Sequence, residues 1–410
     1  MIVIRPKNID SEQKKKDYFA VVIPLLLLLF LFSPMMFQAK TSYAKTYTVT
    51  PKTKPCDNSK KNANYCENTR QYYMLRSYLN RIEKENGGTL VIGKGTYKIP
   101  NTLFVSSNTN IVLQKDAVLL KTDRGGPKLK PSYTVFILIR STLSKNTAVY
   151  GGHEGEHDIS ITGEGIIDLN NIRASTPVIA LIMGHNKNIT LDGITIRNMC
   201  YGHMIEMDAC ENVSVKNCTF TGYTASGMWN KEAINLDVPD PDRNGFNATW
   251  SKKDKTPNES VIIENCVFDR LEAGVGSHRY TGNVFQTGVT IRNNQFTACQ
   301  TAVRILNYKN VTILNNSFTD CAPNDRYPYS FFIAGAHGIC FSGNRFTRCG
   351  VGKQLMQFWC NKGYSAGQDI YPPVTSELTQ DEAALFRTNQ AVECGSCKIY
   401  DCPYDVDFSA

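Results

Sequence analysis

Apolar and polar residues alternate down the middle of this chain in a pattern that returns every 22 to 28 residues. Each copy has apolar residues at its first and third positions, Asn or Gly at the fifth, and Phe or Ile at the eighth. The copies begin at Ile189, Val213, Val261, Val289, Val311 and Ile339. One interval of 48 residues is interpreted as two turns, one of them without a recognisable copy. Alternation with a period of two predicts β-strands, and Asn and Gly are typical of bends.

The repeat predicts a solenoid that is built from strands. Self-similarity at a period of this length is typical of solenoid proteins. Because no helical pattern fits between the copies, each turn is expected to consist of short strands. A chain that winds one turn per ~20–30 residues in strands alone is a parallel β-helix. The expected fold class is therefore all-β.

Both ends of the repeat region are expected to be capped. Asn68-Thr69 can begin a helix that runs to about Glu85. Such a helix covers the end of a coil, where open strand edges and apolar residues would otherwise promote aggregation. Residues 68–350 then form the β-helix with its N-terminal cap helix. Residues 351–410, where the pattern is lost, are expected to form an irregular C-terminal cap.

The first 44 residues resemble an export signal. Lys14, Lys15 and Lys16 precede an apolar run at 17–33 that is short for a membrane span. Ser42-Tyr43-Ala44 offers small residues at a cleavage site. We predict a signal peptide at 1–44, a linker-like entry at 45–67, and a secreted extracellular monomer. The alternative is that the segment is not cleaved and anchors the protein to the cell surface. In that case this segment alone would contact the membrane.

Charge and cysteine content add two expectations. The net charge of +8 is compatible with an anionic polymer as partner, but it does not require one. The sequence has no basic–aromatic signature of nucleic-acid binding, so we expect no nucleic-acid partner. Eight of the fourteen cysteines lie at repeat positions and are expected to stack as small hydrophobic side chains: Cys200, Cys210, Cys218, Cys266, Cys299, Cys321, Cys340 and Cys349.

The remaining cysteines are disulfide candidates, since disulfides are common in secreted proteins. Cys56 and Cys66 bracket a short loop near the start. The others lie in the C-terminal tail: Cys360, Cys394, Cys397 and Cys402. Zinc binding by the last three is the alternative.

Three segments that precede the repeats carry a family resemblance. They read GGTLVIGKGTYKI, SNTNIVLQKDAVLL and DISITGEGIIDL, and the Asn-rich repeats follow them. Together they resemble the pectin-lyase-like superfamily over residues 70–350. The resemblance implies a right-handed parallel β-helix like those of polygalacturonases and pectate lyases. It leaves the reaction open, because this fold serves hydrolases, lyases, epimerases and binding proteins.

Four strands of successive turns can be aligned by their inward apolar residues, Ile205, Ile234, Val275 and Val303. Successive turns of a β-helix stack about 4.8 Å apart, so equivalent positions form columns. Side chains alternate along a strand, so the neighbours of these residues point outward. One outward column is Glu206, Asn235, Gly276 and Arg304. The other is Asp208, Asp237, His278 and Leu306.

These columns predict a catalytic site. Asp208 and Asp237, one turn apart, should repel each other and hold different pKa values. One protonated and one ionised carboxyl is the arrangement that glycoside cleavage uses. His278 would orient a group or relay a proton, and Glu232 is the alternative acid. The same carboxylates could instead hold Ca²⁺ for a lyase reaction.

Other residues are expected to bind the substrate. Arg304 would bind a uronate or a developing charge, and its expected companions are Glu206, Asn235 and Arg279. A long loop after Asp237 carries Trp250, and loops of this length are usually functional or disordered. Together with Trp229, which lies just before the preceding strand, this loop could form a groove wall on which sugars stack.

Comparison with the polygalacturonase motifs, N-T-D, D-D, G-H-G and R-I-K, shows similar order and spacing but different residues. The matching stretches are Asn230-Lys231-Glu232, Leu271-Glu272, Gly276-Ser277-His278 and Arg304-Ile305-Leu306. The catalytic Asp pair of that family is absent, and the first acid would be Glu232. These departures argue against ordinary polygalacturonase activity.

Histidines and asparagines outside the columns are interpreted as structural. His153 and His157 have a spacing that resembles a metal site. Their segment, rich in Gly and Glu, is typical of a flexible loop, so no metal is expected there. Three more histidines are assigned structural roles: His185, His203 and His337. The bend asparagines are expected to form side-chain ladders: Asn217, Asn265, Asn293 and Asn315.

The leading hypothesis is a secreted glycoside hydrolase that cleaves an acidic or a plant or microbial wall polysaccharide without a cofactor. The first alternative is a calcium-dependent polysaccharide lyase. The second is a non-catalytic β-helix that binds glycans at the cell surface.

Overall fold

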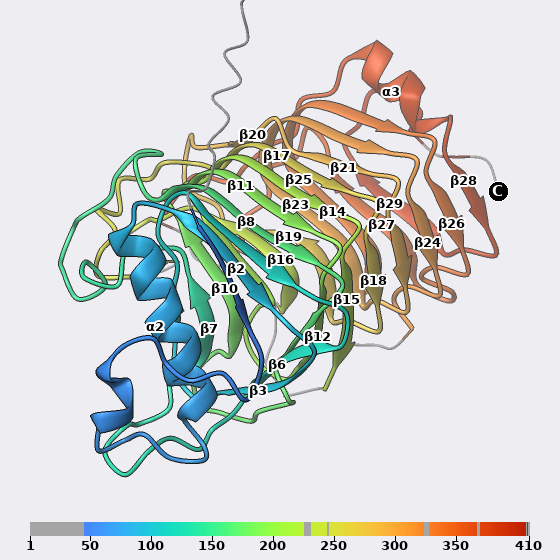
Figure 1. Cartoon of the computed structure of the whole chain (residues 1–410). Helices are drawn as coiled ribbons and strands as arrows, with labels where there is room; N and C mark the ends of the chain where they lie inside the picture. Colours follow the sequence, from blue (N-terminus) through green and yellow to red (C-terminus); the bar gives the residue numbers. More distant parts are fainter. Residues whose placement is uncertain are drawn as a thin grey trace, which may run out of the picture. The chain divides into compact units, whose positions relative to one another are not determined.

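The right-handed parallel β-helix that the sequence predicts is confirmed in the computed structural model (Figure 1). The structure describes residues 45–224, 231–243, 246–323, 328–366, 370–406 and 408. The expected signal segment at 1–44 and Trp229 lie outside these residues. Within the described part of the chain, the helices are too short or too polar to cross a membrane.

Two sheets run along the coil, and all their strand pairings are parallel. The smaller sheet has ten described strands, one from each turn. They are β3 (Gly95–Ile99), β6 (Ala117–Lys121), β9 (Ile166–Asp168), β12 (Thr195–Met199), β15 (Thr219–Tyr223), β18 (Val267–Asp269), β22 (Gln295–Thr297), β24 (Ser317–Thr319), β26 (Arg345–Thr347) and β28 (Gln390–Val392).

The larger sheet bends along its length and contributes the two remaining faces of the coil. One face contains β4 (Leu103–Phe104), β7 (Thr134–Ile137), β10 (Ile179–Gly184), β13 (Ile205–Asp208), β16 (Glu232–Asp237), β19 (Ala273–Gly276), β27 (Gln354–Trp359) and β29 (Ser396–Tyr400). The other contains β1 (Thr46–Val49), β2 (Gly88–Ile92), β5 (Thr109–Leu113), β8 (His157–Gly163), β11 (Lys187–Asp192), β14 (Glu211–Lys216), β17 (Glu259–Glu264), β20 (Gln286–Thr287) and β21 (Thr290–Arg292). Two long strands, β23 (Thr301–Leu314) and β25 (Tyr329–Ser342), pass through the bend and belong to both faces.

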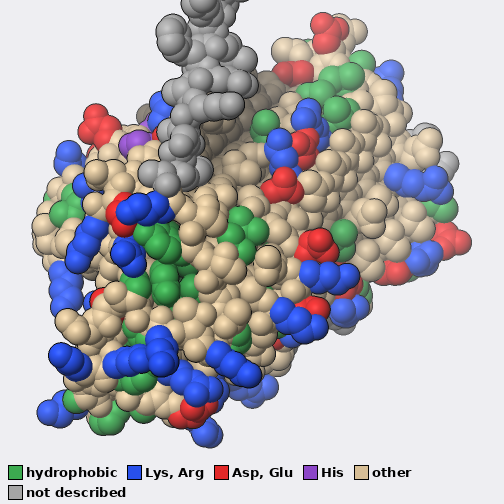
Figure 2. Space-filling model, in the orientation of Figure 1, with side chains coloured by type: hydrophobic (Ala, Val, Ile, Leu, Met, Phe, Trp, Pro, Cys, Tyr) green, Lys and Arg blue, Asp and Glu red, His purple; other side chains and the backbone are tan. Residues whose placement is uncertain are grey.

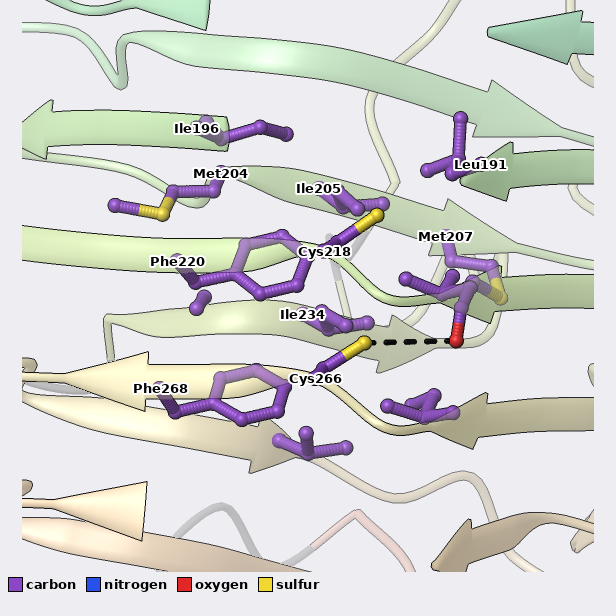
Figure 3. Close-up of a cluster of buried hydrophobic side chains, with 14 of the residues drawn as sticks. Leu191, Ile196, Met204, Ile205, Met207, Cys218, Phe220, Ile234, Cys266 and Phe268 are labelled. Atoms are coloured by element: carbon purple, nitrogen blue, oxygen red, sulfur yellow. Dashed lines mark hydrogen bonds between the residues drawn. The ribbon is translucent and has the colours of Figure 1, made fainter. Parts of the chain in front are cut away.

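The phenylalanine at the eighth position of the repeat fills the coil. Phe220, Phe268, Phe296, Phe318 and Phe346 are stacked, with ring centroids 4.5–4.9 Å apart. Figure 3 shows the start of this stack beside the aliphatic side chains of neighbouring turns. These rings are at most 1% exposed, so the stack excludes water from the centre of the coil.

The asparagine ladder occupies a different position from the one predicted. Asn217, Asn265, Asn293 and Asn315 have left-handed backbones, with φ of 53–56°, a conformation that Asn tolerates. The ladder is formed by the residue after the bend, because that side chain points into the coil. Its members are Asn294, Asn316, Asn344 and Asn389. In each pair an Nδ2 donates to the next Oδ1 at 2.8–3.0 Å.

The repeat cysteines, with the exception of Cys340, are confirmed as core residues, and the disulfide candidates form no bridges. All fourteen are free thiols. Seven of the eight repeat cysteines are buried, and Cys340 is half-buried because it lies on the outward face of β25. In the tail, the backbone N–H of Cys349 donates to Sγ of Cys394 at 3.3 Å. Cys394 therefore extends the column of buried thiols rather than forming a bridge.

The N-terminal cap helix is α2 (Arg70–Lys84), as the sequence predicts. Its buried face includes Leu75, Leu79 and Ile82, and the short 3-10 helix η1 (Asn58–Lys61) precedes it. At the other end the coil is longer than predicted, because β27, β28 and β29 continue the sheets to Tyr400. These strands were missed since their sequences lack the repeat. The helix α3 (Gln380–Phe386) has Thr379 as its N-cap residue, in a capping box with Glu382. Its Phe386 ring stacks on Phe341.

Candidate functional site

The first outward column lies where alternation places it, and the second does so for Asp208 and Asp237. β13 and β16 pair so that Glu206 is opposite Asn235 and Asp208 is opposite Asp237. The next pairings continue the first column through Gly276 to Arg304. The predicted register of the four strands is therefore confirmed.

His278 leaves its strand and turns back toward the acids. β19 ends at Gly276, whose φ of 154° and tight surroundings require glycine. A Cβ at this position would lie 2.1 Å from the carbonyl oxygen of Arg304. Because the backbone turns here, the His278 side chain reaches Glu232 as well as Asp237.

His203 and Glu232 join the site because the alternation of inward and outward side chains breaks at the start of β13 and of β16. Met204 and Ile205 both face the core, as do Ala233 and Ile234. The residue that precedes each pair therefore lies on the outer side. His203 is 8% exposed and Glu232 is 1% exposed.

Five side chains form what we call the carboxylate–histidine network: Glu206, His203, Glu232, His278 and Asp237. His203 Nε2 lies 3.6 Å from Glu206 Oε2, and its Nδ1 lies 3.5 Å from Glu232 Oε2. His278 Nδ1 lies 3.3 Å from the same Glu232 oxygen, and its Nε2 lies 3.8 Å from Asp237 Oδ2. Acid and imidazole thus alternate along the network.

The network separates the protonation states of its acids. Burial and the nearby Asp237 raise the pKa of Glu206 to about 8. Burial also raises the pKa of Asp237, although His278 opposes the shift. Burial acts the same way on Glu232, but His278, His203 and Arg304 outweigh it and hold its pKa at about 2. At neutral pH Glu232 is therefore an anion, while Glu206 holds a proton.

The histidines differ as well. Burial lowers the pKa of His203 to about 4, so its ring is neutral at pH 7. Burial also opposes the charge on His278, but Asp237, Glu232 and Glu206 together raise its pKa above the ordinary value. The Nδ1 of His203 lies 3.0 Å from the Glu232 carbonyl oxygen, which fixes the orientation of the ring.

A cavity of about 820 Å³ opens over part of the network. Five residues proposed from the sequence line it: Glu206, Asp237, His278, Arg279 and Trp250. Its other lining residues are Thr134, Ile137, Ser144, Pro177, Ile179, Ile182, Tyr201, Gly202, His203, Lys231, Phe246, Asn247, Ala248 and Thr249. A volume of this size fits the range of small-molecule and sugar sites.

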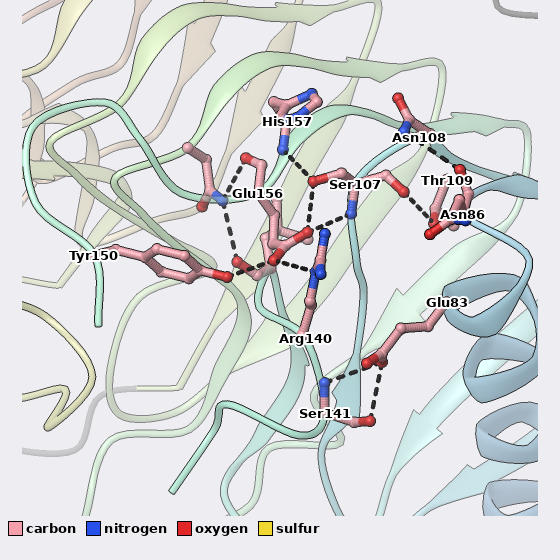
Figure 4. A network of polar contacts seen from close by, with 12 residues as sticks. Glu83, Asn86, Ser107, Asn108, Thr109, Arg140, Ser141, Tyr150, Glu156 and His157 are labelled. Atoms are coloured by element: carbon pink, nitrogen blue, oxygen red, sulfur yellow. Dashed lines mark hydrogen bonds and ion pairs between the residues drawn. The ribbon is translucent and has the colours of Figure 1, made fainter. Parts of the chain in front are cut away.

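The cavity wall comes from the long loop after Asp237, as expected. Phe246 and Trp250 pack edge-to-face with ring centroids 5.3 Å apart. Tyr150 contacts Trp250, and its backbone N–H donates to the Trp250 carbonyl at 3.0 Å. The Tyr150 hydroxyl donates to Glu156, which also accepts from Ser107 and pairs with Arg140 (Figure 4). This buried network fixes the loop that supports the wall.

Other sequence-proposed residues lie away from the cavity. Asp208 is fully buried, and burial together with Glu206 raises its pKa well above the ordinary value. Asn235 is also buried and donates to Glu206 Oε1 at 3.2 Å, so it positions that acid. Glu232 lies behind the two histidines rather than in the cavity lining. Arg304 lies over the Phe332 ring and donates to the Tyr364 hydroxyl at 3.4 Å.

Two residues of the site were missed or misassigned. His203 was interpreted as structural, and Lys231 was not singled out. Lys231 Nζ lies 4.6 Å from the centre of the Tyr201 ring at the cavity edge. The signal in the sequence was that His203 directly precedes two apolar residues, Met204 and Ile205. This signal can be used only if one already knows that both of these residues face the core.

Among the described residues, one group of three could offer ligand atoms to a metal: His203, Glu232 and His278, within 4.8 Å of one another. The two imidazole rings are nearly parallel, with an interplanar angle of 13° and centroids 5.6 Å apart. Imidazole lone pairs lie in the ring planes, so these two do not converge on one point. Calcium fits poorly as well, since it prefers six to eight oxygen ligands.

Comparison with known proteins agrees with the fold. Residues 254–402 match the family described as "Right handed beta helix region". The structure of the Streptococcus pneumoniae surface protein and adhesin PfbA has a TM-score of 0.55 and 18% identity, covering 82% of this chain and 97% of that one. A family 28 exopolygalacturonase of Yersinia enterocolitica has a TM-score of 0.50 and 16% identity, covering 80% and 62%. At these identities the likeness shows a pectin-lyase-like fold and no more.

A curated relative is the plasmin and fibronectin-binding protein A of Streptococcus pneumoniae. It is 26% identical over 250 residues, which are 55% of this chain and 33% of the relative. The chain thus spans about a third of the length of the curated relative that it matches.

Proposed function

We propose that this protein is an extracellular or cell-surface glycoside hydrolase, and that Glu206 and Asp237 supply its acid and base. The observation that carries the proposal is the pairing of two cavity-lining acids with raised pKa values beside the ionised Glu232. Two neighbouring carboxyl groups that cannot both ionise share a proton, and such pairs supply the acid and the base of known enzymes.

Glu206 and Asp237 influence each other's pKa, so they are expected to share one proton at neutral pH. The protonated member would donate to the glycosidic oxygen as the bond to the sugar breaks. The ionised member would accept a proton from the attacking water or attack the sugar itself. His278, whose pKa is raised by Asp237, would in its protonated form stabilise whichever carboxylate is ionised.

The remaining features supply positioning. Asn235 orients Glu206 through its hydrogen bond, and Glu232 holds both histidines in place. The rings of Phe246 and Trp250 offer apolar faces against which a sugar can pack. Lys231 and Arg279 place two cations at the cavity, which suits a glycan with acidic groups.

The test is an incubation of the full-length protein with acidic and neutral polysaccharides, followed by product analysis. The proposal predicts new reducing ends without the ultraviolet absorbance of unsaturated uronates, and it predicts the same rate with calcium and with a chelator. Absorbance that requires calcium would instead establish the lyase reaction.

Binding without cleavage is the second candidate. It is favoured by the name of the curated relative, which describes binding to plasmin and fibronectin. On this account the cavity would retain a glycan that the protein never shortens. Glycan binding that persists in the absence of any product would support it.

A further inference from the structure

Positive charge is concentrated in the N-terminal part of the coil. Residues 45–145 contain 18 Lys and Arg against 6 Asp and Glu, whereas residues 146–410 contain 21 against 28. The excess of +12 in the first part therefore exceeds the net charge of the whole chain. Figure 2 shows Lys and Arg side chains gathered over the end that carries α2 in Figure 1.

Two segments far apart in the sequence bring part of this charge together. The backbone N–H of Lys128 donates to Asn64 Oδ1 at 2.7 Å, which joins the loop after β6 to the segment after η1. The Asn101 side chain donates to the Lys130 carbonyl at 3.1 Å and holds the same loop. The resulting basic cluster consists of exposed residues: Lys60, Lys61, Arg124, Lys128 and Lys130.

The charges of the basic cluster are not neutralised within the described part of the chain. None of the five has a carboxylate within 4.0 Å there. Of the nearby acids, Glu67 is already paired with Arg70 and Lys98, so Asp57 and Asp123 are two negative charges beside five positive ones. Uncompensated cations on one face attract anions over about a Debye length, ~8–10 Å at physiological salt.

We propose that the basic cluster is a docking surface for a linear polyanion that carries repeated sulfate or phosphate groups. Such a polymer needs only spaced cations, which the cluster supplies. A membrane-binding face would also insert apolar side chains. Of the large hydrophobic side chains that are exposed among the described residues, Tyr133 alone belongs to this end, at 38% exposure.

The docking surface is separate from the proposed glycan-cleaving cavity. None of the five residues of the basic cluster lines that cavity. The cluster would therefore hold the protein on a polyanionic surface while the cavity remains open. The proposal stands whether or not the cavity cleaves glycans.

The experiment titrates the full-length protein with heparin and with inorganic polyphosphate at about 50 to 300 mM NaCl. The variant K60E/K128E is compared with K309E/K398E, a matched pair of exposed lysines outside the cluster that changes the net charge equally. We expect K60E/K128E to weaken binding at least tenfold and to reduce the slope of log affinity against log salt by about 1 to 2. We expect K309E/K398E to stay within twofold of the wild type.

A neutralising pair, K61Q/K130Q, guards against a folding defect caused by charge reversal, and it should weaken binding in the same direction. The proposal is overturned by equal weakening in the cluster and control pairs. Absence of binding to both polymers at the lowest salt also overturns it. So does binding to vesicles with anionic lipids but to neither polymer, which would make the partner a membrane.

Discussion

Glu232 Oε2 lies 3.3 Å from Nδ1 of His278, although the two residues belong to different turns and His278 lies beyond the end of its strand. The contact depends on the backbone turn at Gly276. It lowers the pKa of Glu232 and raises the pKa of His278, and His278 lines the cavity. The electrostatics of the site follow from this pair.

Replacing Glu232 with Gln should lower the pKa of His278, because the neighbouring negative charge is lost while the burial remains. The expected change is roughly 1–3 units, the range for removal of an adjacent opposite charge. NMR titration of the histidine ring signals measures it directly. Glu264→Gln, a glutamate paired with Arg292 elsewhere on the coil, is the control. An unchanged His278 pKa would contradict the role given to Glu232.

Glycan cleavage should decline as the pH rises through about 8, where Glu206 loses its proton. Because the pKa of Glu206 is raised, its carboxyl is protonated below about pH 8 and can donate a proton, whereas above that pH it is ionised and cannot. Glu206→Gln should reduce the rate by about 10²–10⁴, as expected for loss of a general acid. Glu211→Gln, a half-buried glutamate one strand further along the chain that pairs with Lys187, should leave the profile unchanged. A wild-type rate that is flat from pH 6 to 10 would exclude Glu206 as the acid.

Trp250→Phe should weaken substrate binding more than it slows the chemical step, since the indole forms cavity wall and does not touch the acids. We expect KM to rise about 3- to 10-fold with little change in kcat, the pattern of lost uniform binding. Steady-state kinetics with the best glycan measure the split. Tyr400→Phe, in the C-terminal turns, serves as the control. A fall in kcat without a change in KM would place Trp250 in the chemistry instead.

Asn316→Ala should destabilise the coil by about 2–4 kcal/mol, because each buried polar group left without a partner costs about 1–3 kcal/mol. Asn316 accepts from Asn294 and donates to Ile291 and Asn344. The adjacent Asn315→Gly should change the free energy of unfolding by less than about 0.5 kcal/mol, because glycine adopts its left-handed backbone freely. Urea unfolding of the two variants compares them. Equal losses would mean that the bend residues carry the ladder after all.

The fold and the register of the columns could be predicted because both depend on simple periodicity. Phe296 and its equivalents recur at one position of the repeat, and Ile205 and Ile234 align two turns without ambiguity. The outward partners of these residues then follow from alternation along a strand. That reasoning placed Glu206, Asp237 and Arg304 correctly.

The parts that could not be predicted depend on departures from periodicity. His203 faces outward because two inward residues follow it, and a pattern of strict alternation hides such a break. His278 reaches Glu232 through the turn at Gly276 rather than along the column. Which acids line the cavity depends on where the loop with Trp250 folds, and no local pattern specifies that position.

The most direct test of the central claim compares wild type, Glu206→Gln and Asp237→Asn as full-length proteins on one panel of polysaccharides. Circular dichroism first confirms that the coil is intact in each. Reducing ends released by the wild type are then measured over time at pH 7. The account predicts cleavage of at least one glycan by the wild type and its loss in both variants. Equal cleavage by all three proteins, or no cleavage of any glycan by the wild type, would contradict it.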